Sequence, residues 1–152
     1  MTDQELKNRV AIVALIVLGV VLSVFTVLFT FALIGHNAAT RAGYEAATLQ
    51  NLKTIAMSEA QYFYTHKRTF GTLAQLCADS GLSTKFSGNP AIVDGYVFTL
   101  MLTRKPDGSS RYEITADPQN NSTGSNHFYL DADHDGIRVN ADRQAGPTDP
   151  FQ

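Results

Sequence analysis

The segment VAIVALIVLGVVLSVFTVLFTFALIG, from Val10 to Gly35, contains no charged side chain. A helix rises about 1.5 Å per residue, so this segment spans roughly 39 Å, more than the ~30 Å hydrocarbon core of a bilayer. A helix that is apolar on every side cannot be hidden inside a domain of this size. The sequence therefore predicts a transmembrane helix over residues 10–35, with the membrane as its first partner.

The basic residues on either side of this segment predict its orientation. Lys7 and Arg9 lie directly before it, whereas the next basic residue after it is Arg41. Loops rich in Lys and Arg tend to stay in the cytoplasm. We therefore expect a cytoplasmic head over residues 1–9 and an extracytoplasmic location, in the periplasm or at the cell surface, for everything after Gly35.

A cleaved signal peptide is the alternative interpretation of the same segment. Its apolar core is about 7–15 residues long and ends at a small-x-small cleavage site. Here the apolar segment is much longer, and Ala38 and Ala39 follow the polar pair His36-Asn37. The pattern favours an uncleaved single-pass anchor.

The helix is expected to continue beyond the membrane, to about Lys67. No proline interrupts residues 37–67, and good helix formers are frequent there. Small and apolar residues recur at steps of three, four and seven, which draws one stripe along a helix. The stripe consists of Ala38, Ala42, Leu49, Leu52, Ala56, Ala60 and Phe63. We expect Leu49, Leu52, Ala56 and Phe63 to hold this helix against a sheet.

The sheet is predicted from a change of hydrophobic period after about residue 95. Alternating apolar and polar residues indicate strands over 96–103, 111–116, 127–131 and 137–140, separated by turn-forming residues. A short helix after Thr69, ending near Gly81, and a loop over 87–94 precede them. Successive short strands with tight turns indicate an antiparallel meander. The predicted fold class is α+β, with three to four strands, one domain over residues 36–140 and an irregular tail over 141–152.

This order of parts resembles the type IV pilin and type II secretion pseudopilin family. The local similarities lie in Ala46–Ala56 with Glu59–Phe63, in Thr69–Leu76 and in Gly95–Phe98, followed by Tyr112–Pro118 and by His127–Asp131 with Ile137-Arg138. The resemblance implies a pilin-like extracytoplasmic domain and a structural subunit of a pilus or pseudopilus filament. It also implies self-association, or association with other pilin-like subunits, and an assembly machinery in the membrane.

In the transmembrane segment, Gly19, Ser23, Thr26 and Thr30 have side chains small enough for close contact between helices. We expect these four residues to mediate packing in an assembly. Family precursors, however, carry a basic leader that ends in Gly or Ala, followed by an aromatic residue or Met and by Thr-Leu. Residues 8–15, NRVAIVAL, lack this pattern. The alternative function is therefore an unprocessed, single-pass binding or scaffold protein that does not polymerise.

Residues 131–142, DADHDGIRVNAD, match the start of a calcium-binding loop of the EF-hand type. Asp131, Asp133, Asp135 and Asp142 are the candidate metal ligands, and Gly136 permits a sharp turn. Against calcium, Arg138 stands at a place that is usually apolar, and Asp142 stands where a bidentate Glu is expected. An Asp-Gly hairpin turn explains most of the same segment. Both interpretations stay open.

The sequence contains no pattern that indicates nucleic-acid binding, a disulfide framework or catalysis. The net charge of −2 gives no electrostatic footprint for nucleic acid. The single cysteine, Cys77, excludes an internal disulfide framework and is expected to be a buried thiol or an intermolecular bridge. Phosphate-binding loops, nucleophile elbows and zinc-ligand spacings are not found. We therefore expect a protein that is not an enzyme, with no small-molecule substrate and with calcium as its one candidate cofactor.

Overall fold

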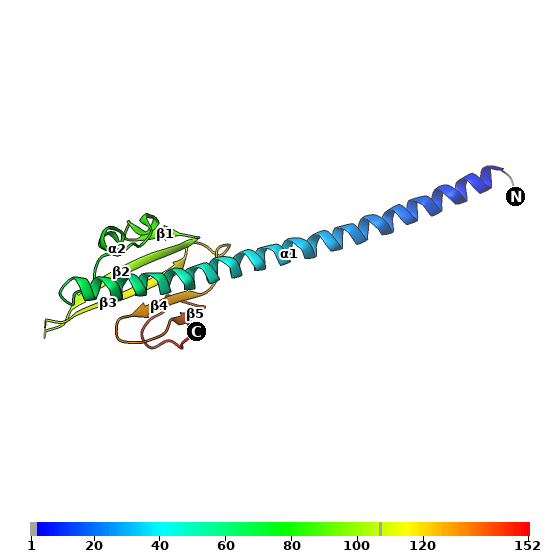
Figure 1. Ribbon diagram of the computed structural model, residues 1–152. Helices are drawn as coiled ribbons and strands as arrows, with labels where there is room; N and C mark the ends of the chain where they lie inside the picture. Colours follow the sequence, from blue (N-terminus) through cyan, green and yellow to red (C-terminus); the bar gives the residue numbers. More distant parts are fainter. Residues whose placement is uncertain (1–2, 107) are drawn as a thin grey trace. The chain divides into compact units, whose positions relative to one another are not determined.

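The computed structural model describes residues 3–106 and 108–152, which fall into two compact units that divide after Ala39 (Figure 1). The helix α1 spans Asp3–Thr65 and contributes to both units. The chain is α+β, as the sequence predicted.

The first unit contains one candidate membrane-spanning helix, formed by Ile12–Thr30 of α1. The side chains of this stretch are exposed, and none of the stretch is buried by the rest of the described chain. By its length and composition it is able to cross a bilayer, which confirms that part of the sequence prediction.

In the second unit, α1 ends at Thr65, slightly before the expected end at Lys67. Lys67 and Arg68 adopt positive φ angles of 54° and 61°, which a right-handed helix does not allow. A second helix, α2, spans Leu73–Asp79. Thr72 and Gln75 form a capping box at its start, and Gly81, with φ of 70°, follows its end as the sequence predicted. A 3₁₀ turn, η1, covers Thr84–Phe86.

The sheet has five antiparallel strands in sequential order, β1 to β5. They are β1 Ala91–Val93, β2 Tyr96–Arg104, β3 Ser110–Pro118, β4 His127–Asp131 and β5 Arg138–Asn140. The expectation of three to four strands was too low, because β1 lies in the segment 87–94 that we predicted to be a loop. Asp94 and Gly95, with φ of 49° and 75°, form the tight turn that pairs Val93 with Tyr96.

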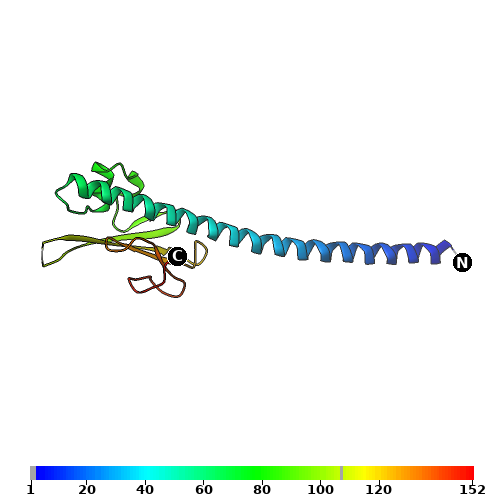
Figure 2. The ribbon, with the colours of Figure 1, turned by 60° about the horizontal axis from the view of Figure 1, so that its bottom comes forward.

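The second half of α1 lies over one face of this sheet, and the core forms between them (Figure 2). Of the four residues expected to hold the helix to the sheet, Leu52 is fully buried, and Leu49 and Ala56 are partly buried against the core. Phe63 is half-buried and stacks on Phe70. The centre of the buried stripe is Thr48, Leu52, Ile55, Glu59 and Tyr62. The buried stripe therefore lies at a different angle around the helix than the stripe that we predicted. The prediction left out the two polar residues and the tyrosine that occupy the centre of the buried stripe.

Candidate functional site in the acidic loop between β4 and β5

The four carboxylates of the predicted calcium loop lie in different environments. Asp131 is the last residue of β4, and its side chain is fully buried. Asp133 and Asp135 lie in the exposed turn that connects β4 to β5. Asp142 follows β5 and is exposed as well. The loop thus has one buried carboxylate at its start and three that face solvent.

Asp131 organises the turn through its own carboxylate. The backbone N–H groups of Asp133 and His134 both donate to Asp131 Oδ1 at 2.9 Å, and His134 Nδ1 lies 3.0 Å from the same oxygen. Burial by itself raises the pKa of Asp131, but the hydrogen bonds from His134 and Asp133 outweigh this effect and hold the pKa below its usual value. Asp131 is therefore a charged group that shapes the turn from inside.

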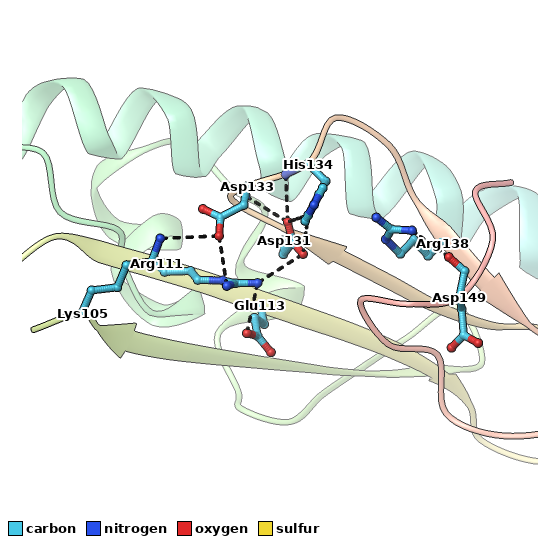
Figure 3. Close-up of polar contacts among 8 residues, drawn as sticks. All are labelled: Lys105, Arg111, Glu113, Asp131, Asp133, His134, Arg138 and Asp149. Atoms are coloured by element: carbon cyan, nitrogen blue, oxygen red, sulfur yellow. Dashed lines mark hydrogen bonds and ion pairs between the residues drawn. The ribbon is translucent and has the colours of Figure 1, made fainter.

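Arg111 on β3 supplies the positive charge that the acidic loop requires (Figure 3). Its Nη1 lies 3.0 Å from Asp133 Oδ2, and its Nη2 lies 3.4 Å from both Asp131 Oδ2 and Glu113 Oε1. Lys105 Nζ lies 3.6 Å from Asp133 Oδ2. Sequence reasoning missed Arg111 as part of this site. The available signal was the strand register, since β3 and β4 pair Glu113 with Asp131 and Arg111 lies two residues before Glu113.

In the structure, the carboxylates at the start of this loop are paired with an arginine. Calcium requires several carboxylate and carbonyl oxygens that converge on one point. Here the Asp131 and Asp133 carboxylates are directed at the Arg111 guanidinium. Among the residues that the structure describes, no three His, Cys, Asp or Glu side chains gather in a way that could hold a metal ion. Calcium binding by this loop remains a prediction from the sequence motif alone.

The segment after β5, which we predicted to be irregular, is held by Asp149. Asn140 Nδ2 and Arg143 Nη2 donate to Asp149 Oδ1 at 2.9 and 2.8 Å, and Gly146 N–H donates to Oδ2 at 2.8 Å. These hydrogen bonds hold the pKa of Asp149 below its usual value, and the one from Asn140 has the largest effect on it. The segment lacks regular secondary structure, apart from an isolated bridge at Phe151, but it is tied to β5.

The acidic loop also forms one wall of an open hollow of about 670 Å³ whose other wall is the second half of α1. Phe63 and Phe70 lie in this hollow, and the helix side chains Met57 and Tyr64 beside it are exposed. The described chain therefore leaves part of this helix face uncovered next to the loop.

The four residues expected to mediate helix packing lie on one exposed face of the apolar stretch of α1. The hydroxyls of Ser23, Thr26 and Thr30 donate to carbonyls of their own helix at 2.7–2.9 Å. Nothing lies within 4 Å of the position that a Cβ would take on Gly19. The hydroxyl groups are thus satisfied within the helix, which leaves small, apolar surface at this face.

In comparisons with known proteins, no family model, no curated protein and no solved structure matches this chain.

Proposed function

We propose that the chain is a pilin-like structural subunit that is anchored in a membrane and assembles through the apolar part of α1 into a type IV pilus or pseudopilus filament. The observation that carries this proposal is the exposed apolar stretch Ile12–Thr30, which belongs to the same helix whose second half packs on a five-stranded antiparallel sheet. Such a stretch is unfavourable in water, and it is stabilised by lipid or by equivalent helices of neighbouring subunits. We propose a structural role with no catalytic step.

The helix face formed by Gly19, Ser23, Thr26 and Thr30 supports assembly by helix packing. Lipid tails are as apolar as leucine, so helices in a membrane gain little from burying apolar surface against each other. Close backbone approach at small residues gives the van der Waals contact that favours association instead. Because the three hydroxyls are already bonded within the helix, this face can meet another helix without leaving a polar group unpaired.

The proposed topology has residues 1–9 in the cytoplasm and the sheet domain on the other side of the membrane. Lys7 and Arg9 before the apolar stretch, and the next basic residue only at Arg41, support this orientation. The partners that follow are other copies of this chain or similar subunits, and a membrane assembly machinery.

The decisive experiment is to isolate the protein from its own membrane, to image it by electron microscopy and to measure its intact mass. We expect filaments, and a mass that lacks about the first nine residues. The double variant Gly19→Leu/Ser23→Leu keeps the stretch apolar but fills the small face, so it should stay in the membrane and lose filaments. Val20→Leu/Val24→Leu, which adds bulk elsewhere on the helix, is the matched control and should retain them.

The second candidate function is an unprocessed single-pass anchor that presents the sheet domain to a partner in the cell envelope. The sequence NRVAIVAL of residues 8–15, which lacks the processing pattern of the pilin family, favours it. An intact N-terminus together with the absence of filaments would select this candidate over the first.

A further inference from the structure

Four basic side chains from two separate parts of the chain line one open hollow of about 780 Å³. Lys67 and Arg68 come from the turn after α1, and Arg104 and Lys105 come from the end of β2 and the residue after it. Phe70 N–H donates to Ser110 Oγ at 3.4 Å and thereby joins the turn to the start of β3. Sequence patterns did not reveal this cluster, because more than thirty residues separate the two basic pairs.

Two of these basic residues, Lys67 and Arg68, have an unusual backbone conformation. Lys67 and Arg68 both have positive φ angles, which non-glycine residues rarely adopt. Hydrogen bonds from Arg68 N–H to the Phe63 carbonyl and from Thr69 N–H to the His66 carbonyl fix this turn at 3.0 and 3.1 Å. This capped end of α1 places Lys67 and Arg68 at the edge of the hollow.

The described residues that line the hollow carry more positive than negative charge. Lys105 lies 3.6 Å from Asp133, which Arg111 also contacts. Within residues 3–106 and 108–152, Lys67, Arg68 and Arg104 form no ion pair, and Asp133 is the one acidic residue that lines the hollow. The carbonyls at the C-terminal end of α1 attract cations, which explains why the basic residues Lys67 and Arg68 stand there. They do not account for Arg104 and Lys105, which reach the same hollow from the sheet. Because the whole chain has a net charge of −2, this local excess is not a consequence of a basic protein.

We propose that this hollow binds a small soluble ligand that carries two or more adjacent phosphate groups. Arg and Lys are the side chains that hold phosphate oxygens, Arg through its planar fork and Lys as a point charge. The hollow is in the size range of small-molecule sites and much larger than one phosphate, and its cations are distributed over two elements. Phe63 and Phe70, whose ring centroids lie 4.8 Å apart, provide an apolar wall beside the charges for the rest of the ligand.

The test is isothermal titration calorimetry on the full chain in neutral detergent, with sodium tripolyphosphate as the probe and inorganic phosphate for comparison. We expect saturable binding of tripolyphosphate that is at least about tenfold tighter than that of phosphate and weakens as salt screens the charges. The variant Lys67→Gln/Arg104→Gln should weaken tripolyphosphate binding by about tenfold or more. Arg41→Gln/Lys53→Gln removes the same charge outside the hollow and should leave binding within about twofold of the unmodified chain.

Three results would overturn the proposal. The first is no saturable binding of tripolyphosphate. The second is an equal loss in both double variants, which would make the effect one of net charge. The third is binding of a short single-stranded oligonucleotide about tenfold tighter than tripolyphosphate, which would replace the small ligand by a nucleic acid. None of these results depends on whether the chain forms filaments.

Discussion

Glu59 is a carboxyl group buried completely between the second half of α1 and the turn that contains Gly71. Gly71 N–H donates to Glu59 Oε2 at 3.0 Å, whereas Oε1 is buried with no hydrogen-bond partner in the described part of the chain. Burial raises the pKa of Glu59 to about 7, against a smaller lowering by the Gly71 hydrogen bond. The folded protein therefore holds this proton more tightly than the unfolded chain. The contribution of Glu59 to stability is largest below about pH 4.5 and is lost as the pH rises through 7.

We predict that Glu59→Gln removes most of this dependence on pH. The amide keeps an oxygen for Gly71 N–H and cannot ionise, so the variant should be more stable than the unmodified protein at pH 8 by on the order of 2–3 kcal/mol. At pH 4.5 the two proteins should differ by less than about 1 kcal/mol. Urea unfolding of the full chain in neutral detergent measures both values. Asp135→Asn, which removes an exposed carboxylate, is the control, and an equal gain for Glu59→Gln at both pH values would contradict the argument.

Gly124 is a glycine that the packing requires. A Cβ at this position would overlap the hydroxyl and ring of Tyr96, which is fully buried and donates a hydrogen bond to the Asn126 carbonyl at 3.0 Å. We predict that Gly124→Ala destabilises the domain by about 1–3 kcal/mol, because the tyrosine has no free space into which to move.

Gly43→Ala is the matched control. Gly43 is an exposed helical residue with nothing within 4 Å of the added Cβ, so alanine should stabilise the domain by about 0.5–1 kcal/mol. Thermal unfolding that ranks the two variants in the opposite order would refute this assignment.

For the β4–β5 loop, the sequence motif and the geometry lead to different expectations. The motif predicts bound calcium, whereas the geometry predicts that Arg111 neutralises the carboxylates. If Arg111 neutralises the loop, Arg111→Gln should lower the free energy of unfolding by about 1–2 kcal/mol, because buried Asp131 loses its guanidinium neighbour. The loss should be the same with and without a calcium chelator, and the chelator should leave the melting temperature of the unmodified protein unchanged. A lower melting temperature on chelation, abolished by Asp133→Ala, would instead support the calcium site that the sequence motif predicts.

The same elements show where sequence patterns were sufficient and where they were not. Periodicity predicted the helix over 37–67 and four of the five strands, because alternation and helical spacing are local properties. It missed β1, which has only three residues and was hidden by the surrounding Gly, Asn and Pro residues, although the Asp94-Gly95 pair was a hairpin signal. It also placed Glu59 outside the buried stripe, since a charged residue is rarely completely buried. Arg111 could be placed beside Asp131 only from the register of β3 and β4, and the basic cluster depends on the contact between the turn after α1 and the end of β2.

For the whole molecule, the apolar segment was the feature that the sequence predicted best, since hydrophobic length requires no knowledge of tertiary contacts. The candidate span Ile12–Thr30 lies within the predicted range of 10–35. What this segment would do besides crossing a membrane depends on other chains, and a single sequence contains only the small-residue face as a signal for them. Anchoring in the membrane can therefore be tested independently of assembly.

We predict that the full chain stays in the membrane pellet after extraction with alkaline carbonate. Val17→Arg/Val24→Arg places two charges in the span at a cost of about 2.5–3.5 kcal/mol each, so most of the protein should move to the soluble or aggregated fraction. Ile92→Arg/Met101→Arg adds the same charge at exposed positions of the sheet and should remain in the pellet. Because both variants carry the same net charge, a difference between them reports on the apolar stretch itself. Release of the unmodified chain by carbonate would contradict the membrane anchor, and with it the proposal that assembly begins from a helix held in lipid.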